Sequence, residues 1–119
     1  MLDVAKDWVS ETKHEPGVHN AGINIIAWST SHPEAAFKVI QAILKLTEDD
    51  GNLFVCSAAG PLEDFLSLCS DEFAELVFQV AEIDPRLRRA FQHVWQQGMT
   101  DARFKRVQGY SRAANDAKS

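Results

Sequence analysis

The chain has 119 residues, of which 45% are hydrophobic and 24% are charged. This length predicts one domain, and this composition excludes disordered, collagen-like and low-complexity proteins. The apolar runs are far shorter than the roughly 20 residues of a membrane helix, and the first residues carry carboxylates where a secretory signal carries bases. We therefore expect a soluble, cytoplasmic domain without a membrane segment.

The net charge of −5 hides a strongly uneven distribution. Residues 48–84, the acidic block, hold ten carboxylates and no Lys or Arg, whereas residues 85–119 hold eight bases and two acids. Like charges at this density repel one another unless they are paired. Two interpretations stay open. Either the basic C-terminal third folds back and neutralises the acidic block, or the block is an exposed surface that attracts a basic partner.

Three helices are expected before the acidic block. Apolar residues three or four apart predict a first helix over residues 2–12. A shorter second helix is expected over residues 18–28. The third helix begins at Pro33, since proline suits the first helical turn, and Ser31 and Glu34 have the spacing of a capping box.

Five more helices are expected after a turn at residues 48–52. A fourth covers residues 53–59, and Gly60-Pro61 interrupts it before a fifth. Ser70 precedes the sixth, whose inward residues are predicted to be Phe73, Leu76, Val77, Val80 and Ala81.

The last two helices have clear start signals. Asp84-Pro85 opens a seventh that we expect to extend to Gln96, because Leu87, Ala90, Phe91 and Val94 continue its apolar stripe. Thr100 is a suitable N-cap for the eighth.

No convincing strand pattern accompanies these signals. Seven or eight short antiparallel helices joined by short turns predict an all-α domain over residues 1–110, with residues 111–119 as a frayed tail. The helices are expected to pack either as a compact bundle or as a small HEAT-like array.

Two segments carry a family resemblance. One runs Ala-Ala-Gly-Pro-Leu-Glu-Asp over residues 58–64, and the other joins Asp84-Pro85 through Arg86 and Ala90 to Val94-Trp95-Gln96. Together they resemble a bacterial domain-of-unknown-function family, numbered 6869, over about residues 53–107. The chain departs from the family pattern only by apolar exchanges, at Phe65, Leu87 and Phe104. The resemblance implies an α-helical domain and no particular activity.

The first of these segments has a structural and a functional interpretation. Gly60 and Pro61 suit a tight connection between helices. Glu63 and Asp64 then lie in a first helical turn, where the helix dipole favours carboxylates. Alternatively, these carboxylates pair with Arg86 and Arg89 in a buried network, or they face a cationic partner.

Trp95 also has two interpretations. It is expected to lie in the core or to be half-buried. The other residues assigned to the structural motif are Gly60, Pro61, Arg86 and Arg89. The alternative is an exposed anchor, because Trp and Arg are frequent hot spots of protein interfaces.

The signals for chemistry are weak. Cys56 and Cys69 are expected to be free thiols, and neither forms a metal-binding pattern with a histidine. The six glycines form no phosphate-binding loop, and no nucleophile motif is present, so we expect no cofactor, no metal and no enzymatic activity. The acidic pI of about 5.3 argues against a nucleic-acid partner.

These observations favour a protein that acts by binding another protein. The main hypothesis is an inhibitor of the immunity or antitoxin kind, whose acidic surface blocks a basic, toxin-like partner. Its predicted contact residues are Asp49, Asp50, Glu63, Asp64, Asp71, Glu72 and Glu75.

Two other hypotheses stay open. The first alternative is a helical adaptor or scaffold, with self-association possible, whose apolar interface uses an exposed member of the set Trp8, Trp28, Trp95 and Tyr110. A third, an enzyme, requires Glu63, Asp64, Arg89 and His93 to converge in a pocket.

Overall fold

The computed structural model describes residues 5–10 and 27–118, with side chains up to Arg112, and these ranges contain helices and no strand. The named helices are α3 (Pro33–Thr47), α4 (Gly51–Ser57), η1 (Ala58–Leu62), α5 (Glu63–Leu68), α6 (Asp71–Ile83), α7 (Pro85–Phe91) and α8 (Asp101–Lys118). Residues 5–10 and 27–31 are also helical. The predicted all-α class is confirmed. The expected second helix falls mostly outside the described residues.

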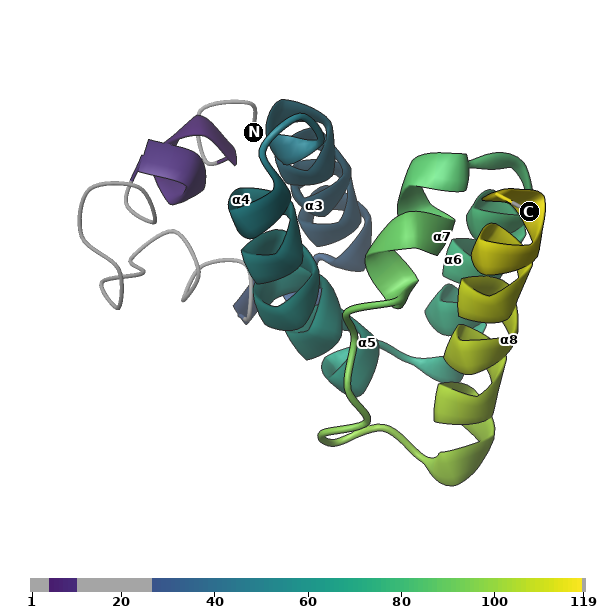
Figure 1. Ribbon diagram of the computed structural model, residues 1–119. Coiled ribbons are helices and arrows are strands. Elements are labelled where there is room, and N and C mark those ends of the chain that lie inside the picture. Colours follow the sequence, from purple (N-terminus) through teal and green to yellow (C-terminus); the bar gives the residue numbers. More distant parts are fainter. Residues whose placement is uncertain (1–4, 11–26, 119) are drawn as a thin grey trace.

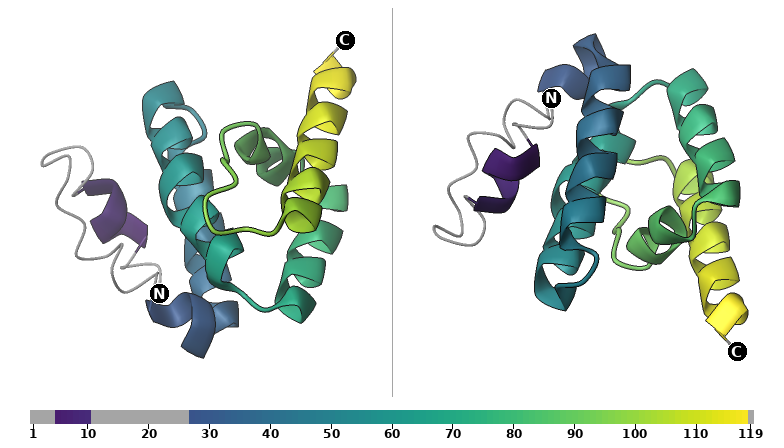
Figure 2. Two further views of the ribbon diagram at one scale, coloured as in Figure 1. Left: turned by 90° about the horizontal axis from the view of Figure 1, so that it is seen from below. Right: turned by 90° about the horizontal axis from the view of Figure 1, so that it is seen from above.

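The helices form two groups with α7 between them. Figures 1 and 2 show α3 beside the rod that runs from α4 to α5, and α6 beside α8 on the other side of the molecule. Helix α7 contacts α3, α4, α6 and α8. In a solenoid each unit contacts only its sequence neighbours, so this central helix makes the described part of the chain a bundle rather than a HEAT-like array.

Aromatic side chains fill the core in two clusters. Phe65 stacks on Phe37 with a ring separation of 5.7 Å and meets Phe73 edge to face at 5.6 Å. In the second cluster, Tyr110 stacks on Phe78 at 5.6 Å. Such aromatic pairs add about 0.5–1.5 kcal/mol beyond the burial of their area. Each cluster links helices from different parts of the sequence.

Three predicted helix starts are confirmed by their caps. The Ser70 hydroxyl accepts the Phe73 N–H at 3.2 Å at the start of α6. Asp84 Oδ1 accepts the Arg86 N–H at 3.0 Å, with Pro85 at the first position of α7. Thr100 Oγ1 accepts the Arg103 N–H at 3.2 Å. Each cap satisfies an N–H group that has no partner inside its helix.

Two details of the predicted helices are wrong. Ser31 does not cap α3, because it lies in the helical segment 27–31 and donates its hydroxyl to the Ala27 carbonyl at 3.0 Å. The N-cap of α3 is His32, without a side-chain cap bond. Leu76, predicted to point inward, is exposed. The buried stripe of α6 is instead Ala74, Val77, Phe78 and Ala81, which faces α7 and α8.

The predicted interruption at Gly60-Pro61 is also wrong. Helix α4, the π-helical turn η1 and α5 follow one another without a break from Gly51 to Leu68. The Glu63 N–H donates to the Ala58 carbonyl, five residues back. The wider turn accommodates Pro61, which has no N–H and whose ring collides with the preceding turn of a regular α-helix.

The π turn also explains the spacing of the buried residues. Phe54, Ala58, Leu62 and Leu66 are all buried and are four residues apart. In a regular α-helix that spacing drifts by about 40° at each step, or roughly 120° from first to last. A π turn absorbs one extra residue, about 100° of rotation, and so keeps the four side chains on one side of the rod.

The C-terminal backbone is helical as far as Lys118, as part of α8. Fraying of residues 111–119 stays a prediction, as does the domain boundary at residue 110. Among the described residues, no helix has the length and apolar character needed to cross a membrane.

Candidate functional site

The two motif segments meet at the start of α5. Glu63, the first residue of α5, is only 8% exposed. Its Oε1 accepts the backbone N–H of Trp95 at 2.7 Å. Trp95 lies in residues 92–100, the Trp95 loop, which connects α7 to α8 and passes α5 on the way (Figure 1). A buried carboxylate of one motif therefore holds the backbone of the other.

Gln97 provides the second contact between α5 and the Trp95 loop. Its side-chain amide is assigned with the nitrogen toward the carboxylates, the orientation in which it donates to Glu63 Oε2 at 3.1 Å and to Asp64 Oδ1 at 3.3 Å. Gln97 has a φ of 44°, in the left-handed region that non-glycine residues rarely adopt. We call these contacts of Glu63 and Asp64 with Trp95 and Gln97 the carboxylate clamp.

The carboxylate clamp contains no cation. No Lys or Arg among the described residues forms an ion pair with Glu63 or Asp64. Burial raises the pKa of Glu63, an effect that the Trp95 N–H opposes and the neighbouring Asp64 charge reinforces. Burial also raises the pKa of Asp64, and the Gln97 amide opposes it. Amide donors are the partners of these two carboxylates.

The prediction that Trp95 lies in the core is wrong, because its side chain is 74% exposed. The sequence interpretation extended α7 to Gln96, but the helix ends at Phe91. Trp95 therefore does not follow the helical periodicity on which that prediction depended. Its neighbour Val94 is buried and so is Met99, so segment 95–98 between them is fixed in the core at both ends.

The alternative network of Glu63 and Asp64 with Arg86 and Arg89 is not formed. Both arginines reach Glu48 instead, with Arg86 Nε at 2.7 Å and Arg89 Nη2 at 3.6 Å from its Oε2. This contact lowers the pKa of Glu48, chiefly through the hydrogen bond from Arg86.

The four residues of the enzyme hypothesis are divided between two clusters. The Arg89 guanidinium lies 5.5 Å from the centre of the Phe54 ring, and His93 meets that ring edge to face. Glu63 and Asp64 belong to the carboxylate clamp. The contacts of the described residues therefore do not unite them.

The predicted partner-binding residues are scattered over the structure. Asp71 and Glu75 form ion pairs with Arg103 and Arg106 of α8. Asp50 caps α4 by accepting the Leu53 N–H at 3.2 Å. Asp49 and Glu72 are exposed and form no ion pair within the described part of the chain. Within the described residues, the C-terminal third thus pairs with three of the ten carboxylates of the acidic block, Glu48, Asp71 and Glu75, which agrees in part with the first interpretation of the charge pattern.

Arg103 is a structural residue that the sequence interpretation missed. Its side chain is 11% exposed, and Nη1 donates to the carbonyls of Leu66 at 2.7 Å and Cys69 at 2.9 Å. It thereby caps the C-terminal end of α5 with a positive charge, where the helix dipole favours one. Only its separation from these residues in sequence hid this role.

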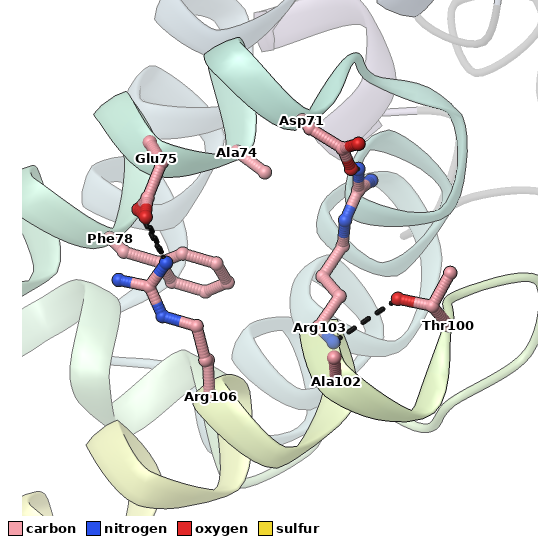
Figure 3. Close-up of a pocket in the computed structure, with 8 residues that line it drawn as sticks. All are labelled: Asp71, Ala74, Glu75, Phe78, Thr100, Ala102, Arg103 and Arg106. Carbon is pink, nitrogen blue, oxygen red and sulfur yellow. Dashed lines mark hydrogen bonds and ion pairs between the residues drawn. The ribbon is translucent and has the colours of Figure 1, made fainter.

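A pocket of about 190 Å³ lies between α6 and α8 (Figure 3). The ion pair of Arg103 with Asp71, 2.6 Å long, forms one end, and the pair of Arg106 with Glu75 forms the other. Small-molecule sites commonly enclose about 300–1,000 Å³, so this pocket is small for a substrate. Its charged groups already pair with one another. No group of three or more potential metal ligands occurs among the described residues.

Comparison with known proteins gives one match. A family described as "Family of unknown function (DUF6869)" matches residues 11–114. The chain therefore belongs to this family, as its motifs indicated. No curated protein and no solved structure matches it.

Proposed function

We propose that this member of the DUF6869 family is a protein-binding module that contacts its partner through Trp95. One observation carries the proposal: a tryptophan side chain is 74% exposed on a loop whose backbone is held by a buried carboxylate. Burying a tryptophan in a partner yields a large favourable free energy, and tryptophan is among the commonest interface hot spots.

The fixed backbone adds to this argument. Binding costs conformational entropy when a loop must become ordered at the interface. The Trp95 loop is anchored by buried Val94 and Met99 and by the carboxylate clamp between them. A partner therefore meets a preorganised aromatic side chain. This is the adaptor hypothesis of the sequence, with Trp95 as its anchor.

Substitution of Trp95 tests the proposal. Purified wild-type chain, Trp95→Ala and Ile83→Ala are used as baits in the lysate of the producing cell, and the captured protein is then purified and titrated. Ile83 is the matched control, because it is an apolar side chain that is 83% exposed at the end of α6. We expect Trp95→Ala to weaken affinity at least about tenfold without changing the melting temperature. Equal affinity of the wild-type chain and Trp95→Ala contradicts the proposal.

The inhibitor of the immunity or antitoxin kind is a second candidate. It is favoured by Asp49 and Glu72, exposed carboxylates without an ion pair in the described structure. Exposed carboxylates accelerate association with a basic partner, and salt suppresses that effect. The double variant Asp49→Asn/Glu72→Gln then slows association at low salt. An affinity that is insensitive to salt favours Trp95 instead.

A further inference from the structure

We infer that Glu63 positions the Trp95 loop through its negative charge, and that neutralising this carboxylate releases residues 95–98. The carboxylate clamp then makes the conformation of the Trp95 loop, and the exposure of Trp95 to a partner, sensitive to acid. The consequence for partner binding rests on the proposed function. The acid sensitivity of the Trp95 loop is a property of the free chain and is measured without a partner.

The first step concerns the hydrogen bond from Trp95. A hydrogen bond to an ionised acceptor is roughly twice as strong as one between neutral groups. The Trp95 N–H lies 2.7 Å from Glu63 Oε1, a distance typical of such charge-assisted bonds. Protonation leaves a neutral acceptor in the same place, so the backbone of Trp95 is held more weakly.

The second step concerns Gln97. Its amide nitrogen donates to one oxygen of Glu63 and one of Asp64, an arrangement that requires both oxygens to accept. A proton on Glu63 Oε2 leaves a weaker acceptor and places a second donor beside the Gln97 amide. Rotating the amide lets its oxygen accept from that proton but then directs this oxygen at Asp64. Protonation therefore weakens at least one of the two Gln97 contacts.

The third step is that few other contacts hold this segment. Residues 95, 97 and 98 are exposed, between the buried side chains of Val94 and Met99. Gln96 donates to Asp101 Oδ1 at 2.6 Å and to the Met99 carbonyl at 3.1 Å, which fixes the side of the loop that faces α8. On the side that faces α5, Gly98 lies close to Ser67, and the hydrogen bonds to this side are those of the carboxylate clamp.

The charged groups on the surrounding elements have other partners, which leaves Glu63 as the group whose protonation changes the Trp95 loop. Asp64 is the neighbour whose charge acts on it. In the loop, His93 meets the Phe54 ring, and on α8 Asp101 accepts from Gln96. Arg103 binds the carbonyls at the opposite end of α5, and Arg86 and Arg89 of α7 reach Glu48.

Glu63→Gln is the informative variant, because the amide oxygen still accepts the Trp95 N–H while the charge is lost. Burial raises the pKa of Glu63, so ionising it costs folding free energy, and we expect no loss of global stability. Nuclear magnetic resonance of the labelled full chain measures each backbone amide separately. We expect hydrogen exchange at the Trp95 amide to accelerate about tenfold, with exchange at buried Val77 unchanged.

The pH dependence gives a second readout. In the wild-type chain the Trp95 amide resonance is expected to titrate with a midpoint above the ordinary carboxyl value of 4.5, and in Glu63→Gln this titration is lost. Glu82→Gln is the matched control, because Glu82 is an exposed carboxylate that accepts a bond from Tyr110. His93→Gln removes the nearby imidazole and should keep the titration.

Three outcomes overturn the inference. The Trp95 amide does not titrate above 4.5 in the wild-type chain, Glu63→Gln leaves its exchange unchanged, or Glu63→Gln accelerates exchange at Val77 equally. The last result means that Glu63 acts only in folding. Loss of binding in Trp95→Ala is measured separately. A failure of the proposed function is therefore distinguishable from a failure of the claim that the charge of Glu63 positions the Trp95 loop.

Discussion

The acidic block is used in two different ways in two parts of its sequence. Along the α6–α8 interface its carboxylates are exposed and pair with arginines, as Asp71 does with Arg103 and Glu75 with Arg106. At the start of α5, Glu63 and Asp64 contact amide groups and no cation. The first region balances charge at the surface, where solvent weakens each ion pair. The second uses charge in a less hydrated place to orient a loop.

This difference shows that net charge alone does not identify a functional surface. The exposed carboxylates that appear most available to a partner are partly occupied by the C-terminal third of the same chain. Glu63 and Asp64, whose hydrogen bonds are the most specific, are less exposed than those carboxylates. Stability and pH measurements separate the two regions.

The largest expected effect comes from removing Arg103 by an Arg103→Met substitution. The two part-buried carbonyls at the end of α5 lose their donor, and water replaces it only in part. A buried carbonyl left unsatisfied costs about 1–3 kcal/mol, so we expect the free energy of unfolding to fall by about 1–3 kcal/mol in urea denaturation. Asp71→Asn is the control, with a much smaller effect, because the Asp71 side chain is 97% exposed. Equal losses in both variants mean that the ion pair, not the cap, holds α8.

The next effect is on the free energy of unfolding, whose pH dependence has opposite signs at the carboxylate clamp and at Glu48. Burial raises the pKa of Glu63 and Asp64, so between the ordinary and the raised values the folded chain binds protons that the unfolded chain does not. In that window the free energy of unfolding therefore rises as pH falls. Arg86 lowers the pKa of Glu48, so stability is lost as pH falls below its ordinary value of 4.5.

Urea denaturation at intervals of about half a pH unit, between pH 7.5 and pH 3.5, checks the sign of both changes in the free energy of unfolding. Glu63→Gln/Asp64→Asn flattens the upper part of the profile, and Glu48→Gln flattens the lower part. Parallel profiles for the wild-type chain and Glu63→Gln/Asp64→Asn contradict the assignment of raised pKa values to the carboxylate clamp.

The smallest effects are expected at the Glu75–Arg106 ion pair. Arg106 also lies 4.4 Å from the centre of the Phe78 ring, a cation–π contact of about 0.5–1 kcal/mol. Arg106→Ala is therefore expected to cost more than Glu75→Gln. Thermal unfolding with and without 0.5 M salt, roughly three times the physiological ionic strength, separates the two contributions. Salt should remove the effect of Glu75→Gln and leave most of that of Arg106→Ala.

Much of the fold is visible in the sequence because local rules govern it. Ser70, Asp84-Pro85 and Thr100 mark helix starts through bonds that span only two or three residues. The continuous α4–α5 rod was missed because Pro and Gly normally end a helix, and a π turn that tolerates Pro61 leaves only the four-residue spacing as a signal. The end of α7 was missed because apolar periodicity continues to Val94 beyond the last helical residue.

The candidate site is less visible because its contacts are distant in sequence. Glu63 and Trp95 are 32 residues apart, and Arg103 is 37 residues from Leu66. Sequence analysis singled out both motifs but not their contact with each other. It placed Glu63 and Asp64 in a first helical turn, with arginine partners as one alternative, whereas the fold gives them amide donors from a distant loop. Of the two interpretations of Trp95, the exposed position agrees with the structure and the core position does not.

The π turn η1 has a consequence for how this family tolerates insertions and deletions. Each residue added to or removed from a helical rod rotates everything beyond it by about 100°. Residues 58–62 lie immediately before Glu63, so a change of length there redirects both α5 carboxylates away from the Trp95 loop without altering any residue of either motif. Within the family, the number of residues in this turn is therefore expected to vary less freely than their identity.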